Sequence, residues 1–223
     1  SFEFYVFGNI HVALAAYCLT KISFIQFEIS NQSLANFVFF STILSYNMIR
    51  LLQLNEINSM MAIWIKANKR SLIALNSVAL IVCVYYLLNF SLVEIIVLLP
   101  LLLATVFYVI PFKKKFSGLR NIPGLKLFLI AITWTGLTLY LPLFSADLNT
   151  SQQVLISGAQ RFLFIIAITI PFDIRDAQFD LPELHTLPQV IGINNSKIIA
   201  LIALALIVVA DFWIPHENTI YFG

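Results

Sequence analysis

The chain has 223 residues, of which 60% are hydrophobic and only 11% are charged, and its formal net charge is +2. Soluble domains carry about 45–50% apolar and about 25% charged residues, so this composition excludes a soluble enzyme, a disordered chain and a nucleic-acid binder. The apolar runs are continuous rather than alternating, and the chain has only seven glycines. These features predict an all-α, polytopic transmembrane helical bundle and disfavour a β-barrel.

Seven segments are apolar and long enough, at about 20 residues each, to be predicted as transmembrane helices. In chain order they are Phe4–Phe24, Leu34–Leu54, Ser71–Phe90, Val93–Pro111, Leu125–Phe144, Val154–Phe172 and Lys197–Trp213. The third and fourth are joined by the short connection Asn89–Leu92, so they are expected to form an antiparallel hairpin. A single transmembrane domain over residues 1–223 is expected.

Basic residues gather on one side of this predicted bundle. The connections after the second, fourth and sixth spans hold Lys66, Lys69, Arg70, Lys113, Lys114, Lys115, Arg120, Lys126, Arg175 and Lys197. The connections on the opposite side hold only Lys21. The positive-inside rule therefore predicts that the N-terminus and these three basic connections are cytoplasmic.

Only eleven acidic residues occur in the chain, and three of them lie close together after the sixth predicted span. Asp173, Asp176 and Asp180 follow the spacing i, i+3, i+7, which places their carboxylates on one face of a helix. Like charges repel, so a cation is expected among them. One interpretation is Mg²⁺ bound by Asp173 and Asp176, because Mg²⁺ takes one or two carboxylates plus substrate phosphates. The other is a solvated helix end whose acids pair with Arg175 and the basic connections.

The connection after the fourth span contains five basic residues within 14 positions: Lys113, Lys114, Lys115, Arg120 and Lys126. One interpretation is an anchor that follows the positive-inside rule and touches anionic headgroups. The other is a diphosphate site, in which Lys113, Lys114 and Arg120 neutralise the phosphate charge beside a metal held by the carboxylates.

The acidic segment also resembles a known motif. Residues Asp173–Asp180 have the form D-x-x-D-x-x-x-D, and the sequence Thr-Leu-Pro at 186–188 and Gly192 follow it. In this pattern the chain resembles the UbiA superfamily of intramembrane prenyltransferases. That family has up to nine spans, with aspartate-rich motifs after spans two and six on the cytoplasmic side. The resemblance covers the chain as seven of the nine spans and implies that the last C-terminal spans are absent from it.

The first motif of that family, N-D-x-x-D-x-x-x-D, is degenerate here. Asn47 is retained, but the three aspartate positions hold Met48, Leu51 and Asn55, and Arg50 lies one residue before the central position. Arg50 is able to replace one metal ion and contact phosphate directly as a bidentate fork. Alternatively, Arg50 pairs with an acid of the second motif and closes the site.

The resemblance implies transfer of a polyprenyl group from a polyprenyl diphosphate to an aromatic or lipid acceptor at the cytoplasmic face, with Mg²⁺ as cofactor. It implies catalytic roles for Asp173, Asp176 and Asp180, and contacts to the diphosphate from Asn47, Arg50 and the basic connection. The alternative, which the degenerate first motif favours, is a catalytically inactive relative that binds lipid or serves as a partner subunit of a membrane complex. Either protein is expected to be a multi-pass protein of the bacterial inner membrane, in contact with bilayer lipid.

Overall fold

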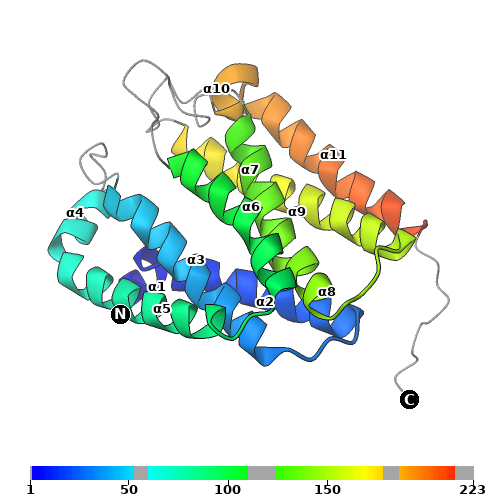
Figure 1. Ribbon diagram of the computed structural model, residues 1–223. Coiled ribbons are helices and arrows are strands. Elements are labelled where there is room, and N and C mark those ends of the chain that lie inside the picture. Colours follow the sequence, from blue (N-terminus) through cyan, green and yellow to red (C-terminus); the bar gives the residue numbers. More distant parts are fainter. Residues whose placement is uncertain (1, 53–59, 110–123, 178–185, 214–223) are drawn as a thin grey trace. The chain divides into compact units, whose positions relative to one another are not determined.

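The computed structural model describes residues 2–52, 60–109, 124–177 and 186–213, and within these residues all the regular structure is helical (Figure 1). Five helical stretches are long and apolar enough to cross a membrane: Gln32–Leu52, Lys69–Leu87, Leu125–Ser145, Gln152–Asp176 and Ile193–Asp211. Two shorter apolar helices cover Ile10–Gln26 and Leu92–Val106. The predicted all-α, multi-pass architecture is confirmed to this extent, whereas seven crossings and a cytoplasmic N-terminus stay predictions.

The chain divides into two compact units, and the predicted single domain over residues 1–223 stays a prediction. The first unit comprises Ser1–Leu103 and Gly136–Asp147, and the second comprises Ala104–Thr135 and Leu148–Gly223. The helices of the first unit are α1 (Phe2–Phe7), α2 (Ile10–Gln26), α3 (Gln32–Leu52), α4 (Met60–Ala67), α5 (Lys69–Leu87), most of α6 (Leu92–Val109), the π-helical η2 (Gly136–Tyr140) and α8 (Leu141–Ser145).

Helix α3 is central to the packing of the first unit, because it contacts both α2 and α5. Ala13 of α2, Ile43 of α3 and Ala79 of α5 form one buried cluster where these helices meet. Small side chains allow close approach of helix backbones, which is the usual basis of helix packing in membranes. A second cluster joins Phe24 and Leu34 with Leu141 of α8.

The prediction of one continuous helix over Phe4–Phe24 is wrong, because the chain breaks between α1 and α2. Asn9 adopts the left-handed conformation at φ 59°, and Asn is one of the few residues that tolerates it. A side chain at Gly8 would place its Cβ only 2.5 Å from the Phe4 carbonyl oxygen, so glycine is required there. The break leaves backbone carbonyls without the N–H donors of a continuous helix, and side chains of α3 donate hydrogen bonds to them.

A second irregularity lies in the stretch Leu125–Ser145, where the helix widens into η2 just before Pro142. Proline has no N–H, so the carbonyl of Thr138 lacks the donor that residue 142 would provide in an α-helix. The hydroxyl of Ser23 on α2 donates to this carbonyl at 2.8 Å. The π-helical turn is therefore stabilised by a neighbouring helix of the same unit.

The second unit is built around α9 (Gln152–Asp176), which contacts α7 (Leu125–Thr135), α10 (Leu187–Ile191) and α11 (Ile193–Asp211). The hydroxyl of Ser151 caps α9 by accepting a hydrogen bond from the N–H of Val154 at 3.3 Å. The buried residues of α9 include both apolar and polar groups: Val154, Ser157, Gly158, Arg161, Ile165, Ile166, Ala167, Ile170 and Asp173. In Figure 1, α9 and α11 run beside each other as the yellow and orange helices.

The Ser23–Thr138 hydrogen bond gives a first test. Ser23→Ala leaves the Thr138 carbonyl without this donor and is expected to lower the free energy of unfolding by about 1–2 kcal/mol. The loss should shrink in a Pro142→Ala background, because residue 142 then carries an N–H. Unfolding in mixed micelles measures both values, with Ser41→Ala as control because the Ser41 hydroxyl donates to the Val38 carbonyl of its own helix. An equal loss in both backgrounds would contradict the proline argument.

Candidate functional site

Helix α9 ends in the two acids that the sequence predicts as metal ligands. Asp173 is only 3% exposed, and Asp176 lies one helical turn further on and is partly exposed. Both lie in the last turn of the helix, where the carbonyl end of the helix dipole disfavours negative charge. Each carboxylate is therefore expected to need a cation. Asp180, the third acid of the motif, lies outside the described residues.

The cation beside Asp173 is Lys126, in the first turn of α7. Its Nζ lies 2.7 Å from Asp173 Oδ1, and its side chain is 25% exposed. Gly124, at φ 74°, forms the turn that precedes α7. A cation is disfavoured at the N-terminal end of a helix dipole, as an anion is at the C-terminal end. Lys126 and Asp173 thus compensate each other at two unfavourable positions.

The cation beside Asp176 is its neighbour Arg175. The guanidinium donates through Nε to Oδ1 at 2.6 Å and through Nη2 to Oδ2 at 2.9 Å, which is a bidentate pair. The same guanidinium lies 5.3 Å from the centre of the Phe172 ring. This pair is largely exposed to the surroundings, so its contribution to stability is small.

Whether the carboxylates of Asp173 and Asp176 suit Mg²⁺ depends on the kind and number of ligand atoms that they offer. Carboxylate oxygens are the ligands that Mg²⁺ prefers, and two of them one turn apart are the number it takes when phosphate oxygens complete its shell. The described residues contain no group of three His, Cys, Asp or Glu side chains placed to hold a metal by themselves. Asp173 and Asp176 would therefore hold such a metal only together with a diphosphate, and in the structure Lys126 pairs with Asp173 and Arg175 with Asp176.

Asn47, which the first motif retains, and Arg50, which lies beside its central position, both form hydrogen bonds within the first unit. Asn47 is 1% exposed, accepts a hydrogen bond from Asn9 Nδ2 at 2.7 Å and donates to the Gly8 carbonyl at 3.1 Å. Arg50 Nη1 donates to the Phe7 carbonyl at 2.9 Å. Asn47 and Arg50 of α3 thus donate hydrogen bonds to the backbone at the break between α1 and α2.

The positions that hold aspartate in the family differ in exposure as well as in chemistry. Met48 is 52% exposed and Leu51 is half-buried, while Asn55 lies outside the described residues. An exposed Met and a half-buried Leu provide no metal ligand. Pairing of Arg50 with the acids of the second motif stays a prediction, because the two groups belong to different units.

Three of the predicted diphosphate ligands, Lys113, Lys114 and Arg120, lie outside the described residues. The described basic residue beside Asp173 is Lys126, which the sequence analysis counted in the basic connection without assigning it to the diphosphate site. A signal was present in the sequence, because Lys126 follows Gly124 and Leu125 and lies in the first turn of an apolar helix. A lysine in the first turn of such a helix lies against the dipole and so requires an acidic partner.

A further buried acid, Glu94 of α6, has a structural role. Its carboxylate accepts hydrogen bonds from the Ser91 N–H at 2.7 Å, the Ser91 hydroxyl at 2.9 Å and the Ser145 hydroxyl at 2.7 Å. Ser91 and Glu94 have the S-x-x-E spacing of a capping box, so they satisfy the first turn of α6. Ser145 links this cap to α8 of the same unit.

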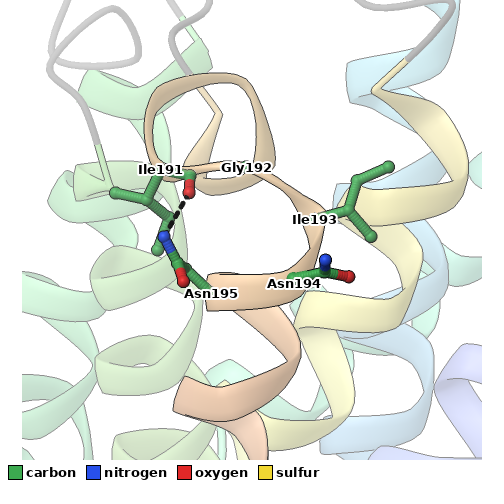
Figure 2. Close-up of a pocket in the computed structure, with 5 residues that line it drawn as sticks. All are labelled: Ile191, Gly192, Ile193, Asn194 and Asn195. Atoms are coloured by element: carbon green, nitrogen blue, oxygen red, sulfur yellow. Dashed lines mark hydrogen bonds between the residues drawn. The ribbon is translucent and has the colours of Figure 1, made fainter.

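An open hollow of about 580 Å³ lies at the turn between α10 and α11 (Figure 2). It is lined by Ile191, Gly192, Ile193, Asn194 and Asn195. The amide of Asn195 points back across the turn and donates to the Ile191 carbonyl at 2.8 Å. None of the five lining side chains is charged, so this hollow lacks the groups that would bind a diphosphate.

The regular structure of the described residues is all helical, and the five long apolar helices indicate a multi-pass membrane protein in which a buried ion pair joins α7 and α9. Comparisons with protein-family models, with curated proteins and with solved structures find no match to it. The resemblance to prenyltransferases therefore depends on the sequence motif alone.

The contacts of Asn47 give the second test. Asn47→Ala leaves the Asn9 amide and the Gly8 carbonyl without partners, and each buried group left unpaired costs about 1–3 kcal/mol. We expect the free energy of unfolding to fall by about 2 kcal/mol or more. The exposed Asn194→Ala is the matched control and should change it little. Unchanged stability of Asn47→Ala would contradict a structural role for this residue.

The two ion pairs give the third test, because they differ in burial. Asp173→Ala should lower the free energy of unfolding by about 2–3 kcal/mol, somewhat less than breaking a fully buried pair, since Lys126 is partly exposed. Asp176→Ala should cost below about 1 kcal/mol. The same unfolding titration measures both variants, and equal losses would show that burial does not distinguish the pairs.

Proposed function

We propose that this chain is a UbiA-like integral membrane prenyltransferase. It would transfer a polyprenyl group from a polyprenyl diphosphate to an aromatic or lipid acceptor at the cytoplasmic face of the bacterial inner membrane. The observation that carries the proposal is the buried carboxylate of Asp173 beside Lys126, with Asp176 one turn away. Burial of charge in an apolar bundle is costly, and ionisable groups placed there are functional-site candidates.

In this proposal Asp173 and Asp176 hold Mg²⁺, and Asp180 completes the acidic face. Mg²⁺ held there would supply positive charge to the diphosphate oxygens, and the diphosphate would leave as the bond between its oxygen and the allylic carbon breaks. Lys126 offers a further positive charge to the departing diphosphate, which is the kind of charge stabilisation that lowers such barriers. The acceptor carbon forms the new bond to the allylic carbon and loses a proton.

Diphosphate contacts from Asn47, Arg50, Lys113, Lys114 and Arg120 remain part of the proposal. The apolar helices would accommodate the polyprenyl tail and exclude water from the reacting carbon.

A second candidate is a catalytically inactive relative that binds lipid or serves as a subunit of a membrane complex. It is favoured by the contacts on α3, where Asn47 and Arg50 bind the carbonyls of Gly8 and Phe7. It is also favoured by Met48 and Leu51 at positions where the family has acids. A protein of this kind would keep the buried Lys126–Asp173 pair as a structural element.

Turnover separates the two candidates and gives the fourth test. Membranes containing the full chain are incubated with a radiolabelled polyprenyl diphosphate, a panel of aromatic and lipid acceptors, and Mg²⁺ or a chelator. The enzyme proposal expects Mg²⁺-dependent product that falls by a factor of about 100 or more in Asp173→Asn and Asp176→Asn. Lys197→Gln, which changes an exposed residue of α11, should retain activity. Absence of product with every acceptor would reject the enzyme and favour the inactive relative.

A further inference from the structure

Three helices of the first unit each carry a buried asparagine. Asn9 directly precedes α2, Asn47 belongs to α3 and Asn76 belongs to α5. Their side chains are buried, because the three residues are 0%, 1% and 7% exposed. A buried amide is costly unless its donor and acceptor atoms have hydrogen-bond partners. The hydrogen bonds of the three amides therefore show where a further partner is needed.

Helix packing places these asparagines at one level of the unit. Ala13, Ile43 and Ala79 form a buried cluster that joins α2, α3 and α5, and each helix has its asparagine three or four residues away, on the same face. The displacement has the same direction in all three helices, because α3 runs antiparallel to both neighbours. Its start meets the end of α5, where Asn36 donates to the Tyr86 hydroxyl at 3.1 Å. Its second half meets the start of α2 through the first two asparagines.

The paired amides of Asn9 and Asn47 leave one acceptor over. Asn47 Nδ2 donates to the Gly8 carbonyl, so the Asn47 oxygen accepts from Asn9 Nδ2, at 2.7 Å. The opposite orientation of the Asn9 amide would bring two acceptors together. Asn9 Oδ1 is thus buried without a hydrogen-bond partner among the described residues, and it does not cap α2 as an asparagine at this position usually does.

Asn76 lacks a partner on both of its polar atoms. Nδ2 and Oδ1 are covered by protein, and neither forms a hydrogen bond in the part of the chain that the structure describes. Exchanging the two atoms by rotation of the amide therefore changes nothing. Asn76 lies on the same face of α5 as Ala79, which packs against Ile43 of α3 in the cluster, so the amide is directed into the unit.

The unpaired atoms define the chemistry of the ligand that this level of the unit would take. They are two acceptors, Asn9 Oδ1 and Asn76 Oδ1, and one donor, Asn76 Nδ2. A metal ion would serve the acceptors and leave the donor unpaired, and an anion would do the reverse. The ligand is also small, because all three atoms are covered. A water molecule both donates and accepts, and buried waters typically form about three hydrogen bonds to such groups.

We propose that one ordered water molecule binds between Asn76 and Asn9. It accepts from Asn76 Nδ2 and donates to the side-chain oxygens of both residues, so it joins α5 to the break between α1 and α2. The direct hydrogen bond from Asn47 to the Gly8 carbonyl joins α3 to the same break. The inference is independent of the proposed function, because it concerns the first unit alone and applies to an enzyme and to an inactive relative.

A crystal structure of the full chain, grown in a lipidic mesophase, tests the site directly. Wild type should show an electron-density peak about 2.7–3.2 Å from Asn76 Nδ2 and from Asn9 Oδ1. Asn76→Leu has the same branching without polar atoms and should lack this peak. A well-ordered Asn76 amide without the peak, or one bonded directly to a protein group, overturns the proposal. A peak that contacts Asn76 but not Asn9 overturns the bridge.

A double-mutant cycle measures the same link through stability. Asn76→Leu and Asn9→Gly are made alone and together, since glycine keeps the left-handed backbone at position 9 and removes the amide. Unfolding in mixed micelles should show that Asn76→Leu lowers the folded-to-unfolded ratio about fivefold or more, because the hydrogen bonds of the water are lost. In the Asn9→Gly background the same change should lower the ratio only about twofold, because the bridge is already broken.

Two further variants serve as controls for this cycle. Asn76→Ala removes the amide without adding bulk and should depend on Asn9 in the same way, which excludes crowding by leucine as the cause. Asn89→Leu removes an exposed amide that donates to the Tyr85 carbonyl just beyond the other end of α5, and its effect should be the same in both backgrounds. Equal effects of Asn76→Leu in both backgrounds overturn the bridge. A higher folded-to-unfolded ratio in Asn76→Leu overturns it too, because the wild-type amide then has no partner to lose.

Discussion

The structure of this chain depends on one constraint: a polar group buried among apolar helices needs a partner within the protein. Pro142 leaves the Thr138 carbonyl without an α-helical donor, and Ser23 of a neighbouring helix supplies one. The break between α1 and α2 likewise leaves the Gly8 carbonyl without a helical donor, and the Asn47 side chain of α3 donates a hydrogen bond to it. In both cases an irregular backbone in one helix requires a particular polar side chain on another.

The same constraint applies to charge at the junction of α7 and α9. Asp173 lies at the C-terminal end of one helix and Lys126 at the N-terminal end of the other, so each opposes a helix dipole and each compensates for the other. The Arg175–Asp176 pair is closer in sequence and is bidentate, but it is exposed, so its contribution to stability is small. Burial rather than geometry makes the Lys126–Asp173 pair the charged centre of the second unit.

Much of the fold could be predicted because long apolar runs have few alternatives to helices. Within the described residues the predicted spans overlap helices, for example Val154–Phe172 within α9 and most of Lys197–Trp213 within α11, although Phe4–Phe24 is divided between α1 and α2. The break at Gly8 and Asn9 could not be predicted, because hydropathy does not report a left-handed residue inside an apolar run. In the candidate site, the spacing of Asp173 and Asp176 indicated a shared helix face, but it did not indicate which cation each would take.

By itself, the sequence determined that this protein is an α-helical membrane protein and that its few charges gather near the ends of its helices, because composition and apolar run length decide these properties locally. Only the tertiary structure decided which charges and polar groups meet. Lys126 and Asp173 are 47 positions apart, and Asn9 and Asn47 are 38 apart. Such pairs form because helix packing brings distant turns together, and no local pattern in the chain contains that information.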